Sequence, residues 1–197
     1  MLPHIVRYNC LSAYRRNGTD MDMKNSFPPT NPDCRDPYVY TQTISHLREI
    51  YHNRGQAMQK VEKLAVKVRE GIKTISPLIQ KSTHAICPCC KEICCINKHG
   101  YYNYEDLIYL HALGLNPTPP AAGIKDSDPC RFLGASGCIM ERHMRPSGCN
   151  WYFCDPLLEH IEETPEYHKF DESLRDIAEM WMKMIEEFKD ISGIPSS

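Results

Sequence analysis

Cysteine is the residue type that points most directly to chemistry in this sequence of 197 residues, which contains eleven cysteines. All of them except Cys10 and Cys34 lie between Cys87 and Cys154. Small secreted proteins use such a density of thiols for disulfides, but they are much shorter, and residues 1–10 lack the pattern of a secretory signal. We therefore expect a cytoplasmic protein whose cysteines stay reduced and bind metal, with Cys10 and Cys34 as incidental thiols.

The cysteine-rich window divides into a first stretch, residues 87–95, and a second stretch, residues 130–154. In the first stretch, Cys87 and Cys90 form a C-x-x-C hook, whose short gap lets two thiolates reach one metal. Cys94 and Cys95 are adjacent and point in different directions, so two centres share them more easily than one ion binds both. The second stretch contributes Cys130, Cys138, Cys149 and Cys154.

Residues around the thiols have properties that suit an anionic metal site. Four thiolates around Zn²⁺ or an oxidised four-iron cluster leave a net negative charge, which burial would penalise. Four nearby cations are candidates to offset it: Lys91, Arg131, Arg142 and Arg145. Three glycines permit positive φ values that turn backbone N–H groups toward sulfur: Gly134, Gly137 and Gly148. Three histidines are close enough in sequence to act as substitute ligands, although we expect them to be ordinary core or surface residues: His84, His99 and His143.

With these motifs, the chain resembles the YkgJ or CxxCxxCC family of zinc- or iron-chelating proteins, which is related to flagellin lysine-N-methylase. The similarity covers residues 87–154 and rests on the cysteines, Tyr104-Glu105-Asp106, Leu113-Gly114-Leu115 and Arg145-Pro146. It implies eight metal-binding cysteines: Cys87, Cys90, Cys94, Cys95, Cys130, Cys138, Cys149 and Cys154. The first stretch departs from the family motif, because three residues separate Cys90 from the cysteine pair and Cys89 is an additional thiol. Cys89 is therefore an alternative ligand to Cys90.

The elements that must position these thiols are helices. Apolar residues repeat every seven positions from Ile44 to Ile79, with a second set from Leu47 to Ile75, and they predict an amphipathic helix over residues 42–76 that ends before Pro77. Gly55 and Gly71 weaken this helix by about 1 kcal/mol each relative to alanine.

Two further helices are predicted. A short one starts after Asn103 as N-cap, places Glu105 and Asp106 in its first turn and stops at Gly114. The other opens at Pro165 and ends near Ser192 and Gly193. It has one apolar face, formed by Phe170, Leu174, Ile177, Trp181, Met184 and Phe188.

The sequence thus predicts a mainly α fold, with long amphipathic helices around an irregular cysteine-rich metal-binding region. We divide it into a loop-rich N-terminal extension at 1–40, the heptad-patterned helix at 41–82, the cysteine region at 83–157 and the C-terminal amphipathic helix at 158–197. The aromatic residues Tyr101, Tyr102, Tyr104 and Tyr109 are expected to pack against the metal loops.

Two functions fit this sequence. The first is a protein that binds an iron–sulfur cluster or zinc and presents its helices to a protein partner, or to a second copy through the 42–76 helix. The second is an enzyme, either a redox enzyme or, by family analogy, a protein lysine methyltransferase. Nucleotide-binding, zinc-protease and serine-hydrolase motifs are absent. The sequence also has no basic stripe for nucleic acid and no apolar run that would span a membrane.

Overall fold

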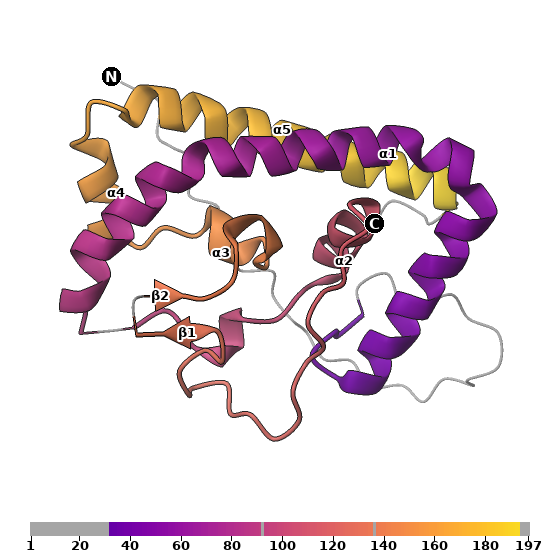
Figure 1. Ribbon diagram of the computed structural model, residues 1–197, viewed down its shortest axis with the longest axis horizontal. Helices are drawn as coiled ribbons and strands as arrows, with labels where there is room; N and C mark the ends of the chain where they lie inside the picture. The colour runs from indigo at the N-terminus through magenta and orange to yellow at the C-terminus, as the bar shows by residue number, and fades with distance from the viewer. Residues whose placement is uncertain (1–31, 92, 136, 194–197) are drawn as a thin grey trace, which may run out of the picture.

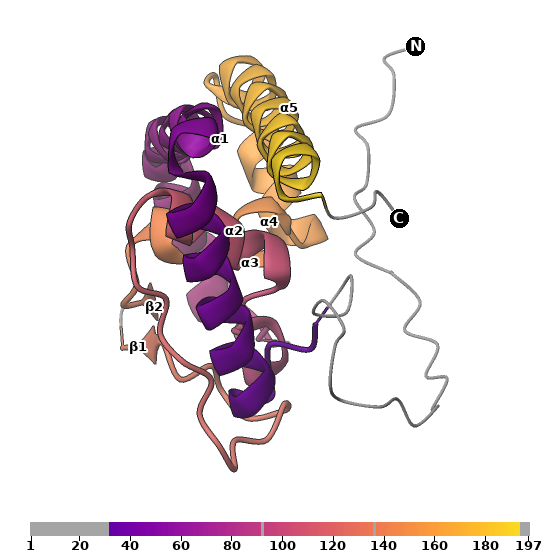
Figure 2. The same cartoon turned by 90° about the vertical axis from the view of Figure 1, so that its right-hand side faces the viewer.

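The computed structural model describes residues 32–91, 93–135 and 137–193. Two long helices, α1 (Pro37–Ile86) and α5 (Tyr167–Ser192), lie side by side and form the frame of the molecule (Figures 1 and 2). The shorter elements and the connecting loops lie against one side of this pair. The structure therefore confirms the mainly α fold.

The shorter elements alternate with irregular chain between the two frame helices. In chain order they are η1 (Cys87–Cys89), η2 (Asn97–His99), α2 (Tyr104–Ala112), β1 (Leu133–Gly134), β2 (Gly137–Cys138), η3 (Arg142–Met144), α3 (Gly148–Trp151) and α4 (Asp155–Glu162). The two strands pair antiparallel, with Leu133 opposite Cys138. This small hairpin and the helices α3 and α4 are elements that the sequence analysis does not predict.

Helix α1 is longer than predicted at both ends. Asp36 caps its N-terminus by accepting hydrogen bonds from the amides of Tyr38 and Val39, and Pro37 provides a preset first turn. The expected extension at 1–40 is therefore helical from residue 37, and its residues 1–31 lie outside the described residues. Pro77 does not end the helix as predicted, because losing one backbone hydrogen bond bends a helix whose other contacts continue.

Figure 1 shows α1 turning sharply after its indigo first segment and bending again toward its magenta C-terminal end. Glycine and proline are the usual causes of such bends, and α1 contains Gly55, Gly71 and Pro77. The second bend directs the C-terminal turn of α1, and with it Cys87, away from the line of α5.

The predicted seam of α1 forms the hydrophobic core. The fully buried seam residues are Leu47, Met58, Val61, Ala65, Val68 and Ile72. They pack mainly against α5, with α2 and α4 covering the rest. Burial of each large apolar side chain contributes roughly 1.5–3 kcal/mol. The surface that indicated self-association is thus occupied within the chain, and self-association through another face of α1 stays a prediction.

Close approach of the two frame helices depends on Gly71. A Cβ atom at this position would lie 2.5 Å from Cγ1 of Ile177 on α5. The glycine that weakens α1 as an isolated helix therefore allows α5 to pack directly onto it.

The predicted ends of α2 and α5 are confirmed to within a few residues. Asn103 caps α2 by accepting from the amide of Asp106, and the Asp106 side chain accepts from the amide of Asn103, which completes a capping box. Helix α5 begins at Tyr167 and ends at Gly193, which has a φ of 76°. The region predicted as one C-terminal helix is divided, since α4 ends at Glu162 before α5 begins.

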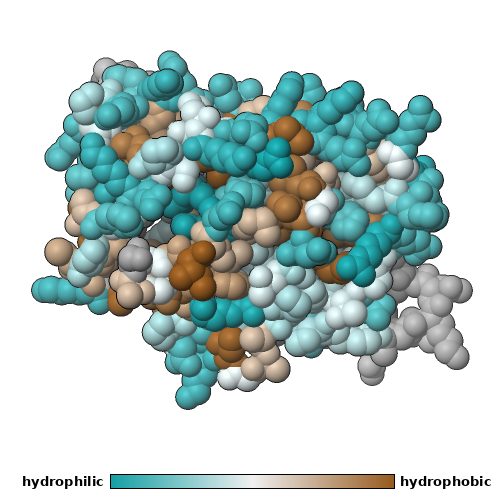
Figure 3. Space-filling view, viewed as in Figure 1, coloured by the Kyte–Doolittle hydropathy of each residue, from teal (hydrophilic) through white to brown (hydrophobic). Residues whose placement is uncertain are grey.

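The surface is more apolar near the cysteines than the charged outer faces of the long helices would suggest. Figure 3 shows brown atoms interrupting the teal surface around the β1–β2 hairpin. Three exposed large apolar or aromatic residues lie within two positions of a candidate ligand: Ile93, Ile139 and Tyr152, of which Ile139 is 73% exposed. Leu133, also exposed, lies three positions after Cys130. None of the helices within the described residues combines the length and the apolar character needed to span a bilayer.

Candidate metal centre

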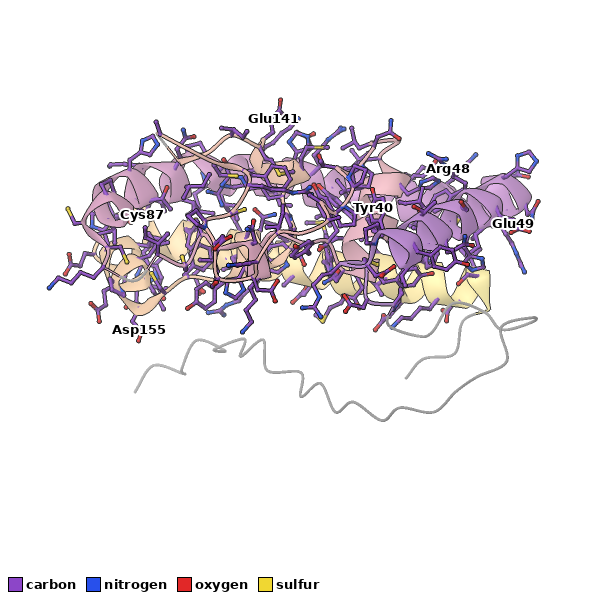
Figure 4. All side chains as sticks on the ribbon, turned by 90° about the horizontal axis from the view of Figure 1, so that it is seen from below. Tyr40, Arg48, Glu49, Cys87, Glu141 and Asp155 are labelled. Carbon is purple, nitrogen blue, oxygen red and sulfur yellow. The ribbon has the colours of Figure 1, made fainter. Side chains whose placement is uncertain are left out.

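The C-terminal end of α1 delivers the first pair of candidate ligands. The helix runs directly into the 3₁₀ turn η1, in which the amide of Cys90 donates to the carbonyl of Cys87 at 3.1 Å. Cys90 follows this turn in an extended conformation, and its thiol is close enough to Cys87 for its charge to raise the pKa of Cys87. Figure 4 shows Cys87 at the same end of the molecule as Asp155, the residue that follows Cys154.

Backbone hydrogen bonds join the first stretch to the second. The amide of Cys130 donates to the carbonyl of Cys95 at 2.8 Å, and Ile96 and Pro129 form an antiparallel bridge beside it. The amide of Asn97 donates to the carbonyl of Asp128 at 2.9 Å. Cysteines that are remote in sequence therefore come together at this junction.

The buried side chain of Asn97 locks the junction. Its Oδ1 atom accepts from the amide of Arg131 at 3.0 Å, and its Nδ2 atom donates to the carbonyl of Lys125 at 3.1 Å. The side chain is 4% exposed, so these groups have little access to water. Asn97 thus fixes the backbone next to Cys130, a role that the sequence analysis did not anticipate.

The β1–β2 hairpin connects Cys130 to Cys138, because Leu133 is paired with Cys138 in the hairpin and hydrogen-bonded to Cys130. The amide of Leu133 donates to the carbonyl of Cys130 at 2.7 Å, and the amide of Ile139 donates to the carbonyl of Phe132 at 2.9 Å. Gly137 has a φ of 109°, which other residues rarely adopt. The expectation of positive φ is correct for Gly137 and wrong for the other two glycines of the second stretch. Gly134 is needed for a different reason, since a Cβ there would lie 2.8 Å from Ile139 Cγ2.

The last two candidate ligands, Cys149 and Cys154, are positioned by the short helices α3 and α4. Cys149 lies in α3, and its Sγ atom is 3.7 Å from the carbonyl oxygen of His99. The preceding Ser147 donates its amide to Oδ1 of Asp106 at 2.9 Å, which ties α3 to the start of α2. Cys154 is the N-cap residue of α4. One thiol therefore lies in the helix before the α3–α4 loop, and the other lies where this loop meets α4.

No disulfide joins the cysteines within the described residues. Burial, followed by the nearby Cys138 and Cys130 thiolates, raises the pKa of Cys149 to about 12. A hydrogen bond between the thiols of Cys94 and Cys95 lowers the pKa of Cys94 and raises that of Cys95. The thiols thus affect one another's charge, which is the situation that a bound cation relieves.

The thiols are gathered, yet they are not preformed into a coordination shell. Among the residues that the structure describes, no three cysteine, histidine or carboxylate side chains are arranged to hold one metal ion. The candidate ligands lie on turns and loops and are exposed or half-buried, so small movements of these segments are compatible with the core. The donor set itself fits zinc or an iron–sulfur cluster, because both are held by thiolates.

Two of the four predicted cations, Arg142 and Arg145, act on the charge of thiols in the second stretch. Arg142 is only 8% exposed, donates to the carbonyl of Cys149 at 3.4 Å, and has an Nε atom with no hydrogen-bond partner. Burial lowers its pKa to about 10, with Arg145 adding to the shift, while the Cys149 and Cys138 thiolates oppose it. No ion pair joins Arg142 to a carboxylate within the described part of the chain.

Arg145 also holds the backbone, because it donates to the carbonyls of Met140 and Cys138, while its charge partly offsets the rise in the pKa of Cys149. The other two cations are placed differently. The guanidinium of Arg131 lies 4.5 Å from the centre of the Phe132 ring. Lys91 is exposed. The positions of Arg131 and Lys91 favour structural or surface roles.

The histidines are surface or partly buried residues. His84 is exposed in the last turn of α1, and the exposed ring of His99 stacks on Tyr152 with centroids 6.5 Å apart. His143 lies 3.4 Å from Glu141. None of these contacts directs an imidazole toward the thiols.

The remaining cysteines differ from the eight candidates. Cys34 is buried under α1, and burial raises its pKa to about 11, with a hydrogen bond to Thr43 acting in the opposite direction. Cys89 is exposed in η1. Cys10 lies outside the described residues.

The tyrosines that were expected to pack on the metal loops divide into two groups. Tyr102 does so, because its hydroxyl donates to the carbonyl of Met144 at 2.8 Å. Tyr104 and Tyr109 instead contact α5, where their rings pack against Phe188 and Trp181. Tyr104 and Tyr109 thus link α2 to α5 and not to the cysteine loops.

Asp106 is the second residue whose role exceeds what its sequence context indicates. It is 2% exposed, and burial raises its pKa to about 6 even though the amides of Asn103 and Ser147 favour the charged form. The N-cap motif reveals the bond to Asn103, whereas the bond to Ser147 joins residues that no local pattern connects.

Comparison of the chain with protein-family models, curated proteins and solved structures finds no match. The resemblance to the YkgJ family accordingly stays a prediction from the cysteine motifs.

Proposed function

We propose that this protein binds metal, as zinc or an iron–sulfur cluster, through the eight candidate cysteines. The observation that carries the proposal is the junction at which Cys130 is hydrogen-bonded to Cys95, since it brings thiols from two remote stretches to one place. In a chain without disulfides among its described cysteines, such a concentration of thiols has metal ligation as its most direct use.

The buried cation beside these thiols supports the same proposal. A guanidinium without a carboxylate partner is costly to bury, and the thiols of Cys149 and Cys138 are the acidic groups whose charges act on Arg142. Metal binding keeps thiolates deprotonated, so it would give Arg142 a permanent anionic neighbour.

The proposed metal acts on the loops and not on the helical frame. The core residues belong mainly to α1, α2 and α5, while most of the candidate ligands lie on segments with little regular structure. Ligand binding energy would therefore stabilise the cysteine loops against a frame that has its own apolar core. A reducing compartment such as the cytoplasm suits this function, because it preserves thiols.

The test is purification without oxygen, followed by elemental analysis, assay of acid-labile sulfide and a visible absorption spectrum. A brown protein with iron and sulfide supports a cluster, and a colourless protein with stoichiometric zinc supports a zinc site. Protein that contains neither metal and takes up neither during anaerobic reconstitution would overturn the proposed function.

A further inference from the structure

The contacts around Cys87 define one group of thiols. The amide of Cys90 donates to the carbonyl of Cys87 across η1, and the thiols of Cys94, Cys154 and Cys90 are close enough for their charges to act on Cys87. Cys154 reaches this position because α4 packs against α1. The group thus combines the C-x-x-C hook and Cys94 of the first stretch with Cys154 of the second stretch.

The contacts around Cys130 define a different group. Cys130 Sγ covers Gly100, where a Cβ atom would lie 2.9 Å from the sulfur, and Cys149 Sγ lies 3.7 Å from the carbonyl oxygen of the preceding residue, His99. The sulfurs of Cys130 and Cys149 therefore lie over consecutive residues of the same turn. Cys138, on strand β2 of the hairpin, also belongs to this group. The charges of Cys138 and Cys130 both raise the pKa of Cys149.

Cys94 and Cys95 lie at the boundary between the groups and distribute between them. The carbonyl of Cys95 accepts the backbone bond from Cys130, and the charge of Cys149 acts on the Cys95 thiol more strongly than that of Cys87 does, so we assign Cys95 to the second group. Cys94 is the thiol with the largest charge effect on Cys87, so it belongs with the first. A tetrahedral site takes four thiolates, and this division gives four to each group.

Arg142 distinguishes the second group from the first. Its nearly buried guanidinium has an unpartnered Nε atom and faces Cys138 and Cys149, the two thiols that affect its charge. In the first group, the charges found among the described residues to act on Cys87 are those of the thiols of Cys94, Cys154 and Cys90. Arg142 is therefore positioned to stabilise a net negative charge at the second group only.

We propose that the chain holds two separate four-thiolate metal centres. The first is formed by Cys87, Cys90, Cys94 and Cys154, and the second, with Arg142 beside it, by Cys95, Cys130, Cys138 and Cys149. This inference rests on the proposed function and adds the number of centres and the ligands of each. No three of the ligands described by the structure are arranged around one point, so binding requires the thiols of each group to move closer together.

The experiment is a titration of the full chain with Co²⁺ after removal of metal under anaerobic, reducing conditions. Thiolate-bound Co²⁺ absorbs strongly in the near ultraviolet, and tetrahedral Co²⁺ has visible bands, so the end point counts four-thiolate sites. The wild-type chain should take up about two equivalents. Cys138→Ser and Cys154→Ser should each leave about one equivalent, because each removes a ligand of a different centre.

Double variants separate two centres from one. Cys138→Ser combined with Cys149→Ser should still bind about one equivalent, since both changes damage the same centre. Cys138→Ser combined with Cys154→Ser should bind none with full thiolate coordination. Cys89→Ser is the matched control on η1 and should leave uptake at about two equivalents, and circular dichroism checks that each variant keeps its helices.

Each outcome bears on a defined claim. Uptake of one equivalent by the wild-type chain, abolished by either single substitution, would overturn the two-centre proposal and leave the proposed function standing. Identical behaviour of the two double variants would also overturn it. A wild-type chain that binds no Co²⁺, zinc or iron would instead remove the proposed function itself.

Discussion

The amide of Cys130 donates a 2.8 Å hydrogen bond to the carbonyl of Cys95, and this bond connects the two cysteine stretches. The antiparallel bridge between Ile96 and Pro129 continues the pairing on one side, and Asn97 extends it with three further hydrogen bonds. The convergence of the stretches is thus built from backbone pairing. The thiols on either side of the junction need only local movement to close around an ion.

Replacing Asn97 with alanine should weaken this junction. The change leaves the amide of Arg131 and the carbonyl of Lys125 without their partner in a buried site, which costs about 1–3 kcal/mol in the free energy of unfolding. Urea denaturation of the metal-free chain measures the loss. Lys98→Ala is the control, because the Lys98 side chain is exposed and the substitution retains the hydrogen bond from the backbone amide of residue 98 to the carbonyl of Asp126. A loss of equal size in the two variants would contradict the role given to Asn97.

Replacing Arg142 with methionine should weaken metal binding at the second centre. The substitution keeps much of the apolar bulk and removes the cation beside Cys149, so we expect a loss of affinity of roughly 10- to 100-fold, as is usual for groups that support metal ligands. Competition with a coloured chelator measures it. Arg131→Met removes an arginine that contacts Phe132 instead, and it should change affinity by less than about threefold. Similar losses in both variants would count against a specific role for Arg142.

The buried carboxyl of Asp106 should give a distinctive pH dependence of stability. Burial raises its pKa from 3.8 to about 6, so the folded state binds the proton more tightly than the unfolded state does. The stabilisation is present at low pH and is lost as the pH rises through the folded pKa. Relative to Asp106→Asn, the free energy of unfolding of the wild-type chain should fall by about 2 kcal/mol between about pH 4 and pH 6.5.

Urea denaturation of the two proteins, in chelator and reductant so that metal release makes no contribution, tests this dependence. The comparison removes the effect of all other titrating groups, including Asp33, whose hydrogen bond to Arg35 lowers its pKa. A constant difference between the two proteins across this range would show that Asp106 has an ordinary pKa.

The two glycines of α1 should respond oppositely to alanine. Gly55→Ala adds a Cβ atom that has nothing within 4 Å and should stabilise the chain by about 0.5–1 kcal/mol through helix propensity. Gly71→Ala places its Cβ 2.5 Å from Ile177 Cγ1, so overpacking of about 1–3 kcal/mol should exceed that gain. Thermal denaturation distinguishes them. Stabilisation by both substitutions would show that α1 and α5 are not as closely packed at Gly71 as the structure has them.

Local sequence signals account for most of the helical frame. The heptad pattern of α1 predicts its buried residues, and Asn103 with Asp106 predicts the start of α2, because these patterns reflect contacts within one helix or along one face. Pro77 misled the prediction of the helix end, since the core contacts of Ile75 and Ile79 on either side of it outweigh one lost hydrogen bond. Pro156 at the start of α4 was a usable signal for a helix that the prediction missed.

The spatial arrangement of the candidate site is harder to predict from the sequence than the helices are. Cysteine spacing identifies the thiols, but it does not say that Cys154 approaches Cys87 or that Cys130 approaches Cys95. The partners of Asn97 lie 28 and 34 residues away, and Ser147 lies 41 residues from Asp106. Such contacts arise from how the chain returns along the frame, for which a local pattern contains no information.

Amide hydrogen exchange, measured by mass spectrometry on the anaerobically prepared chain before and after chelation, tests most directly whether metal joins the two cysteine stretches. The account predicts that segments 87–100 and 126–154 lose protection together when metal is removed, while the central parts of α1 and α5 remain protected by their apolar core. Unchanged exchange in both cysteine segments, or a loss confined to one of them, would contradict it.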